Sequence, residues 1–269
     1  MSNQITELNT LQSFMIGATS GLAEVLTTHP LFIMKTNVQQ GLSIPFKLSS
    51  LYKGVGANAL SFSPITSIQV GASQWMEQHF FAGQTTKLQK MGAAFFGGAL
   101  ASVISCPSEK IMTIQNNNNW SLIQSLREQV KRNGLKGLFS GQMATLWRDG
   151  GFSVCFLMVQ PILKAYMNES NKNETSSALI AGMASGVAAT ILTQPFDTIK
   201  NIQQSSSSPV GFFKTAQQLG MKALYKGSLS RGASVTLSIT LMSMLKEQLE
   251  SSCKKYNDDT PKSSILRKE

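Results

Sequence analysis

Six stretches of the chain combine apolar residues with small ones, and polar segments separate these stretches. None of the six contains a run of about 18 purely apolar residues, which a helix surrounded by lipid would show. Each stretch is long enough for a helix with one apolar face and one polar face. The predicted helices lie near residues 11–39, 55–80, 88–116, 141–168, 176–204 and 228–252.

Shorter segments lie between the two helices of each successive pair. In SLIQSLREQVKRNG, residues 121–134, aliphatic side chains recur at helical spacing among charged and polar ones. This pattern predicts short amphipathic helices on the surface between the long ones.

A proline motif recurs three times and defines an internal repeat. The segments are HPLFIMKTNVQQ, CPSEKIMTIQNN and TQPFDTIKNIQQ, which carry Pro30, Pro107 and Pro195. Small residues nine and thirteen positions before each proline give every one of these helices a small-xxx-small face. Such a face lets helix backbones approach closely, and a proline bends the helix axis. The small residues are Gly21, Gly98 and Gly186, and Gly17, Ala94 and Gly182.

The repeat divides a single domain, residues 1–269, into three similar parts. We expect repeat 1 over 11–80, repeat 2 over 88–168 and repeat 3 over 176–252. Each repeat carries an aromatic motif before its second helix, LYKG, LFSG or LYKG. The last residues, 253–269, are polar and are expected to form a disordered tail.

Composition and charge fit a membrane surface better than a nucleic acid. The chain is 42% hydrophobic and 14% charged, with a net charge of +10. Its basic residues are scattered over the connections rather than interleaved with aromatic residues, which argues against a nucleic-acid partner. The cysteines are far apart, and there is no Gly-rich phosphate loop or catalytic triad. We therefore expect no metal site, no cofactor and no enzyme activity.

The three proline motifs, with the small-xxx-small faces before them and the aromatic motifs after them, resemble the mitochondrial carrier family over nearly the whole chain. The resemblance implies an all-α membrane protein with six transmembrane helices in three two-helix repeats. These helices form a pseudo-threefold barrel in the family, with short amphipathic helices on the matrix side. The resemblance also implies a monomer in the mitochondrial inner membrane that moves a small-molecule substrate by alternating access.

In the family, the bent odd-numbered helices bring charged pairs together at the matrix end. Each pair joins an acid two residues after one proline with a base five residues after another. By this resemblance, Glu109 is expected to pair with Lys200, and Asp197 with Lys35. We therefore expect a working matrix gate that keeps two of its ion pairs.

The third family pair is replaced on both sides by apolar residues, Phe32 and Met112. Removing one partner of a desolvated ion pair strands a charge, whereas replacing both partners is neutral or favourable. The paired replacement therefore indicates a gate that still functions. Three amides occupy the positions at which the family braces its gate pairs. They are Gln39, Asn116 and Gln204.

On the even-numbered helices the family carries an aromatic-acid-x-x-base pattern that closes the cytosolic side. Counting from the aromatic motifs gives Gln74 with Glu77, Pro161 with Lys164, and Lys246 with Leu249. No complete pair survives in this count, and at most Glu77 could meet Lys164 or Lys246. We expect a degenerate gate on this side, which favours a state open to the cytosolic side.

Nine residues after each aromatic lie the cavity positions at which the family binds its substrate. They hold Ser61, Arg148 with its neighbour Asp149, and Ser234. An arginine in a low-dielectric cavity holds a carboxylate or phosphate bidentately. Glu24 is a second intramembrane charge and a candidate substrate contact. By resemblance, an Arg followed by an acid favours carriers of amino acids or carboxylates over adenine-nucleotide carriers. We expect a small anionic or zwitterionic metabolite, that is, a carboxylate, an amino acid or a nucleotide or cofactor.

In the family, binding sites for the lipid cardiolipin lie at the short matrix helices and at the helix N-termini that carry the aromatic-Lys-Gly motifs. The corresponding segments of this chain resemble such sites. Ser140 departs from the motif because it lacks the charge. The matching residues, which we expect to bind cardiolipin, are Lys53, Gly54, Gly141, Lys226 and Gly227.

Two functions are open at this stage. The first is a transporter; the second is a carrier-fold membrane scaffold or binding protein that no longer transports. The coordinated replacement of Phe32 and Met112 favours transport, because a scaffold has no need to lose both partners together. A soluble helical repeat protein does not account for three small-xxx-small faces in register.

Overall fold

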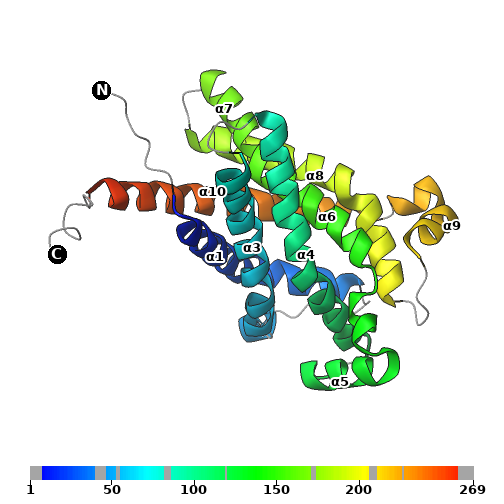
Figure 1. The fold of residues 1–269 in the computed structure, drawn as a ribbon. Coiled ribbons are helices and arrows are strands. Elements are labelled where there is room, and N and C mark those ends of the chain that lie inside the picture. The colour runs from blue at the N-terminus through cyan, green and yellow to red at the C-terminus, as the bar shows by residue number, and fades with distance from the viewer. Residues whose placement is uncertain are drawn as a thin grey trace, which may run out of the picture.

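The computed structural model describes residues 8–39, 47–52, 55–81, 86–118, 120–170, 174–205, 211–225 and 227–259. Side chains are described in these ranges except at a few positions, chiefly residues 31–39. All regular elements within the described ranges are helices. Figure 1 shows them as one bundle, in which the first turns of α1 and the last turns of α10 emerge on the same side.

Apart from the end of α10, the long helices begin and end within two residues of the predicted stretches. The second helix of the middle repeat is a continuous run of α6 (Gln142–Val154), a π-helical turn η2 (Cys155–Val159) and α7 (Gln160–Ser170). The other five are α1 (Thr10–Gln39), α3 (Val55–Phe80), α4 (Lys87–Asn118), α8 (Glu174–Ser205) and α10 (Ser228–Asp259).

The expectation of a disordered tail from residue 253 is wrong for residues 253–259. There the chain is helical, because α10 continues to Asp259. Ser251 and Ser252 lie at the predicted boundary, and their hydroxyls donate back to the Gln248 carbonyl at 2.8 and 2.9 Å. These hydrogen bonds are compatible with a solvated helix, so polarity alone does not end α10. Residues 260–269 lie outside the described residues.

Short helices lie between the long ones of each repeat. They are α2 (Leu48–Leu51), α5 (Leu122–Asn133) and α9 (Phe212–Leu224), and a 3₁₀ turn η1 (Leu135–Phe139) follows α5. The prediction of an amphipathic helix over residues 121–134 is confirmed by α5. Ser121 caps its start by accepting from the Gln124 amide at 3.3 Å, and Gly134 ends it with a positive φ of 64°.

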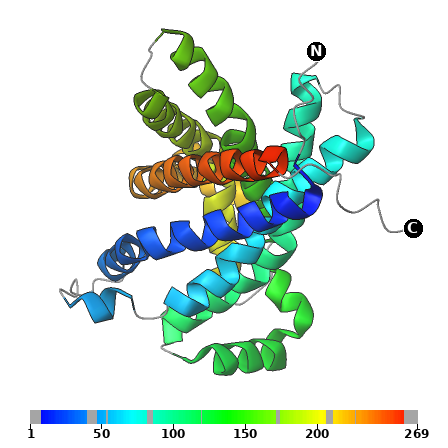
Figure 2. The same cartoon turned by 90° about the vertical axis from the view of Figure 1, so that its left-hand side faces the viewer.

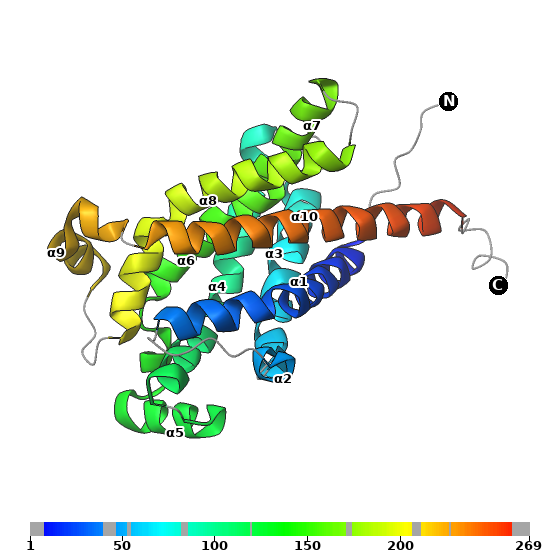
Figure 3. The same cartoon turned by 180° about the vertical axis from the view of Figure 1, so that it is seen from behind.

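The long helices close into a ring. Each contacts the next along the chain, and α10 returns to pack against α1. Figures 2 and 3 show α1 and α10 side by side, and Figure 3 shows α8 changing direction in its C-terminal half, which contains Pro195. Below, the motif end is the end of the long helices that carries the three proline motifs, and the opposite end is the other.

The small-xxx-small faces lie where paired helices approach most closely. A Cβ atom at Gly17 of α1 would lie 2.6 Å from the Thr66 carbonyl oxygen of α3. In the third repeat, a Cβ atom at Gly182 of α8 would lie 2.6 Å from the Thr240 hydroxyl of α10. Carbon atoms do not approach oxygen this closely, so the helix pairs require residues without a side chain at these positions.

The π-helical turn η2 has a local cause in the sequence. Pro161 stands at the second position of α7 and has no N–H to donate. The Gln160 N–H donates to the Cys155 carbonyl, five residues back, as in a π-helix. The wider turn removes the clash that a proline ring makes with an α-helical backbone.

Three helical segments in the described ranges are long and apolar enough to cross a membrane. They are Lys87–Gln115, Leu135–Glu169 and Thr175–Ser205. The described part of the chain is therefore all-helical and contains three candidate membrane-spanning segments.

An apolar layer fills the middle of the ring. It joins α3, η2, α8 and α10 through buried side chains, of which Phe156 and Ile239 are almost fully enclosed. Along the α6–α7 run, this layer lies between Arg148 toward the motif end and Lys164 toward the opposite end. The members are Val70, Cys155, Phe156, Ala189, Ile239 and Met242.

Candidate functional site

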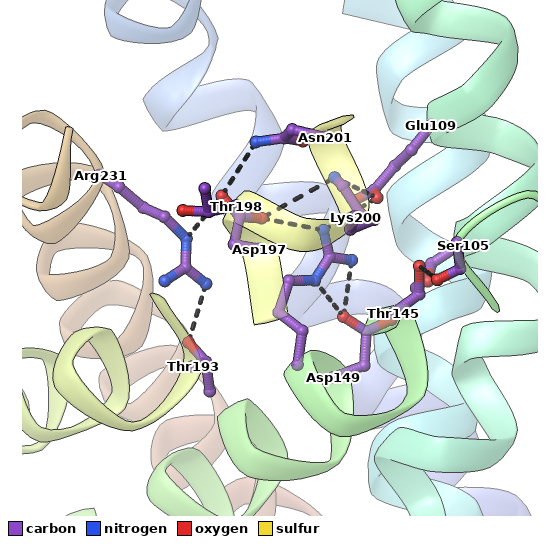
Figure 4. A network of polar contacts seen from close by, with 12 residues as sticks. Ser105, Glu109, Thr145, Asp149, Thr193, Asp197, Thr198, Lys200, Asn201 and Arg231 are labelled. Atoms are coloured by element: carbon purple, nitrogen blue, oxygen red, sulfur yellow. Dashed lines mark hydrogen bonds and ion pairs between the residues drawn. The ribbon is translucent and has the colours of Figure 1, made fainter. Parts of the chain in front are cut away.

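A network of charged side chains occupies the ring on the motif side of the apolar layer (Figure 4). Arg148 of α6 lies at its centre and is 9% exposed. Its Nη1 donates to Glu109 Oε2 of α4 at 2.8 Å, and its Nη2 lies 2.6 Å from Asp149 Oδ1. Asp197 Oδ1 of α8 lies 3.4 Å from Nη1. One guanidinium thus contacts carboxylates from three helices.

Lys200 completes this side of the network. Its Nζ lies 2.8 Å from Glu109 Oε2 and 3.8 Å from Asp197 Oδ1. The proline motifs predict the Glu109–Lys200 contact. The Glu109 oxygen that makes it, Oε2, also accepts from Arg148. Arg148 and Lys200 therefore compete for one carboxylate, which links the predicted substrate position to the predicted matrix gate.

Asp197 has a partner that the sequence count did not find. Arg231, in the first turn of α10, brings its Nε to 3.3 Å from Asp197 Oδ2. The count from the aromatic motif reached Ser234, about one turn further along α10. The sequence feature that could have indicated Arg231 is that it is the one basic residue in the helix start SLSRGAS, whose other residues are mostly small or polar. The expected partner Lys35 lies where side chains are not described.

The ion pairs among the described side chains of the network are balanced in charge. They join the acids Glu109, Asp149 and Asp197 with the bases Arg148, Lys200 and Arg231, three of each sign. Buried charges are retained when they are paired and hydrogen-bonded. Asp149 is held further by the Ser105 hydroxyl of α4, which donates to its Oδ2. In the described part of the chain, no group of His, Cys, Asp or Glu is arranged to hold a metal ion.

The other predicted substrate contacts lie elsewhere in the ring. Glu24 of α1 is 7% exposed and accepts from the Ser238 hydroxyl of α10 at 2.5 Å and from Thr28 at 3.3 Å. It therefore belongs to the seam between α1 and α10. Ser61 of α3 is half-buried, and Ser234 of α10 is exposed.

One gate brace contacts a different partner from the one expected. Gln204 donates from Nε2 to the Cys106 carbonyl of α4 at 3.3 Å, and Lys110 donates to the Gln204 backbone carbonyl. The expectation that Gln204 braces an ion pair is wrong, because α8 at this point faces the α4 backbone just before Pro107. Gln204 thus ties α8 to α4 beside the gate.

The remaining gate positions are only partly described. Met112 is half-buried in α4. The backbone of α1 and α4 is described at the other four, but their side chains lie outside the described part of the structure. They are Phe32, Lys35, Gln39 and Asn116.

The opposite end carries an ion pair between residues that the sequence count did not pair. Lys164 Nζ of α7 lies 2.5 Å from Glu247 Oε2 of α10. Glu247 is not one of the counted positions, and the count offered Lys164 only Glu77 as a partner. The count along α10 reached Lys246. Glu247 is the next residue, and the long side chain of Lys164 reaches it.

The neighbouring positions at this end also differ from the expected gate. Lys246 pairs with Glu250 one turn along α10 at 2.8 Å. Gln74 faces α1, where its Oε1 accepts from the Ser13 hydroxyl at 2.5 Å. The opposite end is thus held by α7–α10 and α1–α3 contacts, in which the counted residues Lys164 and Gln74 have partners other than those expected.

Reversing the Lys164–Glu247 pair tests this contact. We expect Glu247→Lys to lower the free energy of unfolding by about 1 kcal/mol, since both side chains are partly exposed and a repulsion replaces an attraction. The double variant Lys164→Glu, Glu247→Lys is expected to recover most of the loss. Thermal unfolding in detergent measures both, and a double variant no more stable than the single one contradicts the pairing.

The aromatic motifs place glycines where the backbone requires them. Gly141 and Gly227 have φ values of 86° and 83° at the starts of α6 and α10. In this left-handed region a side chain costs about 1–2 kcal/mol. The remaining motif positions, Lys53, Gly54 and Lys226, lie outside the described residues, so cardiolipin binding at this motif stays a prediction.

Comparison with known proteins identifies a family. The model for the mitochondrial carrier protein family matches residues 83–171 and 171–257. The chain is 25% identical to the mitochondrial carnitine carrier of Saccharomyces cerevisiae, over 84% of this chain and 82% of the relative. It is 26% identical to mitochondrial glycine transporter B of Danio rerio, over 89% of this chain and 94% of the relative.

A third relative has a different named substrate. Mitochondrial citrate transporter D of Aspergillus niger is 26% identical, over 81% of this chain and 86% of the relative. The family model covers two consecutive repeats and more than half of the chain, and these relatives align over most of their length. The chain therefore belongs to the mitochondrial carrier family.

Proposed function

We propose that this protein carries a small zwitterionic or anionic metabolite across the mitochondrial inner membrane by alternating access. In this proposal the six long helices are six transmembrane spans, and the protein works as a monomer with cardiolipin at its aromatic-Lys-Gly motifs. Family membership supports transport as the activity. The observation that carries the proposal is Arg148, buried at the centre of the ring with carboxylates from three helices around it.

Arg148 is suited to bind a substrate carboxylate. Its Nη1 is shared by Glu109 and Asp197, at 2.8 and 3.4 Å. A carboxylate from the substrate forms the same charge-assisted hydrogen bonds and replaces one of these internal acids. Asp149, held by the Ser105 hydroxyl, keeps the guanidinium oriented while this exchange takes place.

The charge balance favours a zwitterion among these substrates. The ion pairs among the described side chains join three acids with three bases, so within this set a carboxylate that occupies Arg148 leaves one internal acid without its base. An ammonium group on the same substrate supplies the missing positive charge, whereas a dicarboxylate adds a second unpaired negative charge. The named substrates of two relatives, carnitine and glycine, are zwitterions, whereas citrate, that of the third, is a tricarboxylate, so the preference rests on the charge balance.

Substrate binding also acts on the gate in this proposal. Glu109 holds Lys200 through the oxygen that contacts Arg148. When the substrate occupies Arg148, Glu109 is displaced and the α4–α8 contact weakens. A site that binds substrate and releases the motif-end gate through one arginine fits alternating access.

Uptake by reconstituted protein tests the function. We expect proteoliposomes containing cardiolipin to take up labelled zwitterionic amino acids or related quaternary-ammonium acids faster than dicarboxylates and adenine nucleotides. Arg127→Ala, which removes an exposed arginine on α5, serves as a matched control and should not change uptake. If folded protein takes up none of these compounds, the non-transporting scaffold becomes the better account.

The apolar replacement of the third gate pair gives a further prediction. Phe32→Glu is expected to reduce uptake strongly, because it places an acid opposite Met112 without a base. Adding Met112→Arg should restore part of the activity by re-forming an ion pair. Uptake by the double variant that is no higher than that of Phe32→Glu would show that the two positions are not partners.

A further inference from the structure

We infer that Arg231 is a positioning residue of the transport cycle, which clamps α8 across its Pro195 bend and fixes the gate acid Asp197. Its role in transport rests on the proposed function. The clamp itself is a property of the fold, so it can be tested without a substrate.

Arg231 contacts α8 on both sides of the proline. Its Nη2 donates to the Thr193 hydroxyl at 2.8 Å, and its Nη1 donates to Gln194 Oε1 at 3.3 Å. Both acceptors precede Pro195. Its Nε lies 3.3 Å from Asp197 Oδ2, two residues after the proline. The side chain is 13% exposed, so little water competes for these bonds.

A second contact from the same corner satisfies the backbone at the bend. Pro195 has no N–H, so it leaves the carbonyl of Ile191, four residues earlier, without its helical donor. The Tyr225 hydroxyl donates to this carbonyl at 3.3 Å. One residue before it, the Leu224 carbonyl accepts from the Thr198 hydroxyl at 2.7 Å. The last residue of α9 and the residue that follows it thus support α8 before and after the proline.

Asp197 is oriented by the clamp. Its Oδ2 contacts Arg231 and Asn201, both at 3.3 Å, while its Oδ1 lies toward Arg148 and Lys200, at 3.4 and 3.8 Å (Figure 4). Without Arg231, Asp197 Oδ2 loses its ion pair and keeps the Asn201 contact, so the carboxylate can turn further toward the centre of the ring. Arg231 therefore determines how much negative charge reaches Arg148, although it makes no described contact with Arg148 itself.

The same segment of α8 closes the contact with α4. Beyond Pro195 it carries Lys200, which pairs with Glu109, and Gln204, which covers Cys106 by donating to its carbonyl. Cys106 is fully buried, and its thiol also contacts the Leu138 and Ser140 carbonyls at 3.8 and 3.6 Å. The Ser140 hydroxyl in turn donates to the Gln203 carbonyl of the same α8 segment at 2.8 Å, so this cover also depends on where α8 lies. If Arg231 holds the segment in place, then releasing the clamp uncovers Cys106.

Alkylation of the native cysteines tests the clamp on the full-length protein. N-ethylmaleimide is added to purified protein in detergent with cardiolipin, and peptide mass spectrometry gives separate rates for Cys106 and Cys155. Cys155 lies in the apolar layer and is 2% exposed, so it reports general unfolding. We expect Arg231→Ala to raise the Cys106 rate by about tenfold, as expected when a charge-assisted contact is lost, and to leave the Cys155 rate unchanged.

Three further variants sharpen the test. Arg231→Lys keeps a charge for Asp197 but cannot span all three acceptors, so its Cys106 rate should fall between wild type and Arg231→Ala. Arg127→Ala, the matched exposed arginine, should leave both rates at wild-type values. Adding Arg231→Ala to Asp197→Asn should raise the Cys106 rate less than it does in the wild type, because the two residues act partly through one contact.

Two results would overturn the inference. One is an unchanged Cys106 rate in Arg231→Ala, and the other is an equal rise at Cys106 and Cys155. If Arg231→Ala does not fold, Thr193→Val removes one acceptor at nearly constant volume and should still raise the Cys106 rate; no rise contradicts the clamp. Because no substrate is used, these results bear on the clamp alone, whereas absent uptake bears on the proposed function alone.

Discussion

Arg148→Ala is expected to abolish uptake and to destabilise the fold. Truncation removes the base shared by Glu109, Asp149 and Asp197, and it leaves buried carboxylates with fewer partners. Breaking a buried ion pair by removing one partner costs about 3–5 kcal/mol. Uptake should fall to the level of empty liposomes, and thermal unfolding in detergent should show the loss of stability.

A compensated variant separates these two effects. Asp149 has Arg148 as its ion-pair partner, so adding Asp149→Asn to Arg148→Ala removes one stranded charge. The double variant should regain stability without regaining uptake. Uptake by a folded Arg148→Ala protein at the wild-type rate would remove Arg148 from the substrate site.

Gly98→Val is expected to disrupt the contact between α4 and α6 on which the site depends. A Cβ atom at Gly98 would meet the Asp149 carbonyl oxygen and would lie 2.5 Å from the Ser153 hydroxyl. Overpacking of this kind costs about 3 kcal/mol when the neighbours are backbone atoms that cannot move aside. Because Asp149 follows Arg148, a displaced α6 also moves the guanidinium away from Glu109. Both the unfolding temperature and uptake should fall.

The same helix supplies the control. Gly92 also lies in α4, but a Cβ atom there would meet nothing within 4 Å. Gly92→Ala should leave uptake unchanged and raise stability by up to about 1 kcal/mol, since alanine favours the helix. Equal effects of Gly92→Ala and Gly98→Ala would show that close packing at Gly98 does not control the site.

The helices were predictable because their signals repeat. The small-xxx-small face and the proline occur together three times in the same register. One such match could arise by chance, but three in register identify a repeated helix. The bounds of α1, α4 and α8 followed from this repetition. The π-helical turn before Pro161 was not predicted, because a proline near a helix start does not reveal how the preceding turn will adjust.

Site residues were predicted correctly where both partners stand at fixed positions after the motif prolines. They were missed where a long side chain reaches a partner on another helix. Glu109 and Lys200 were placed together by the motif. Arg231 and Glu247 stand three residues and one residue away from the counted positions, and both find acids or bases on neighbouring helices. Counting along one helix fixes the backbone position but not the reach of a flexible side chain.

Ligand-induced thermal stabilisation tests the central claim most directly, namely that Arg148 binds the carboxylate of a small zwitterion. Purified protein in detergent with cardiolipin is heated with zwitterionic amino acids, quaternary-ammonium acids, dicarboxylates and nucleotides. A ligand at about 100 times its Kd stabilises the folded state by about 2.7 kcal/mol. The account predicts a raised Tm with a zwitterion in the wild type, and none in the compensated Arg148→Ala, Asp149→Asn protein. A Tm that no compound raises in folded wild-type protein, or one that rises equally in both proteins, would contradict it.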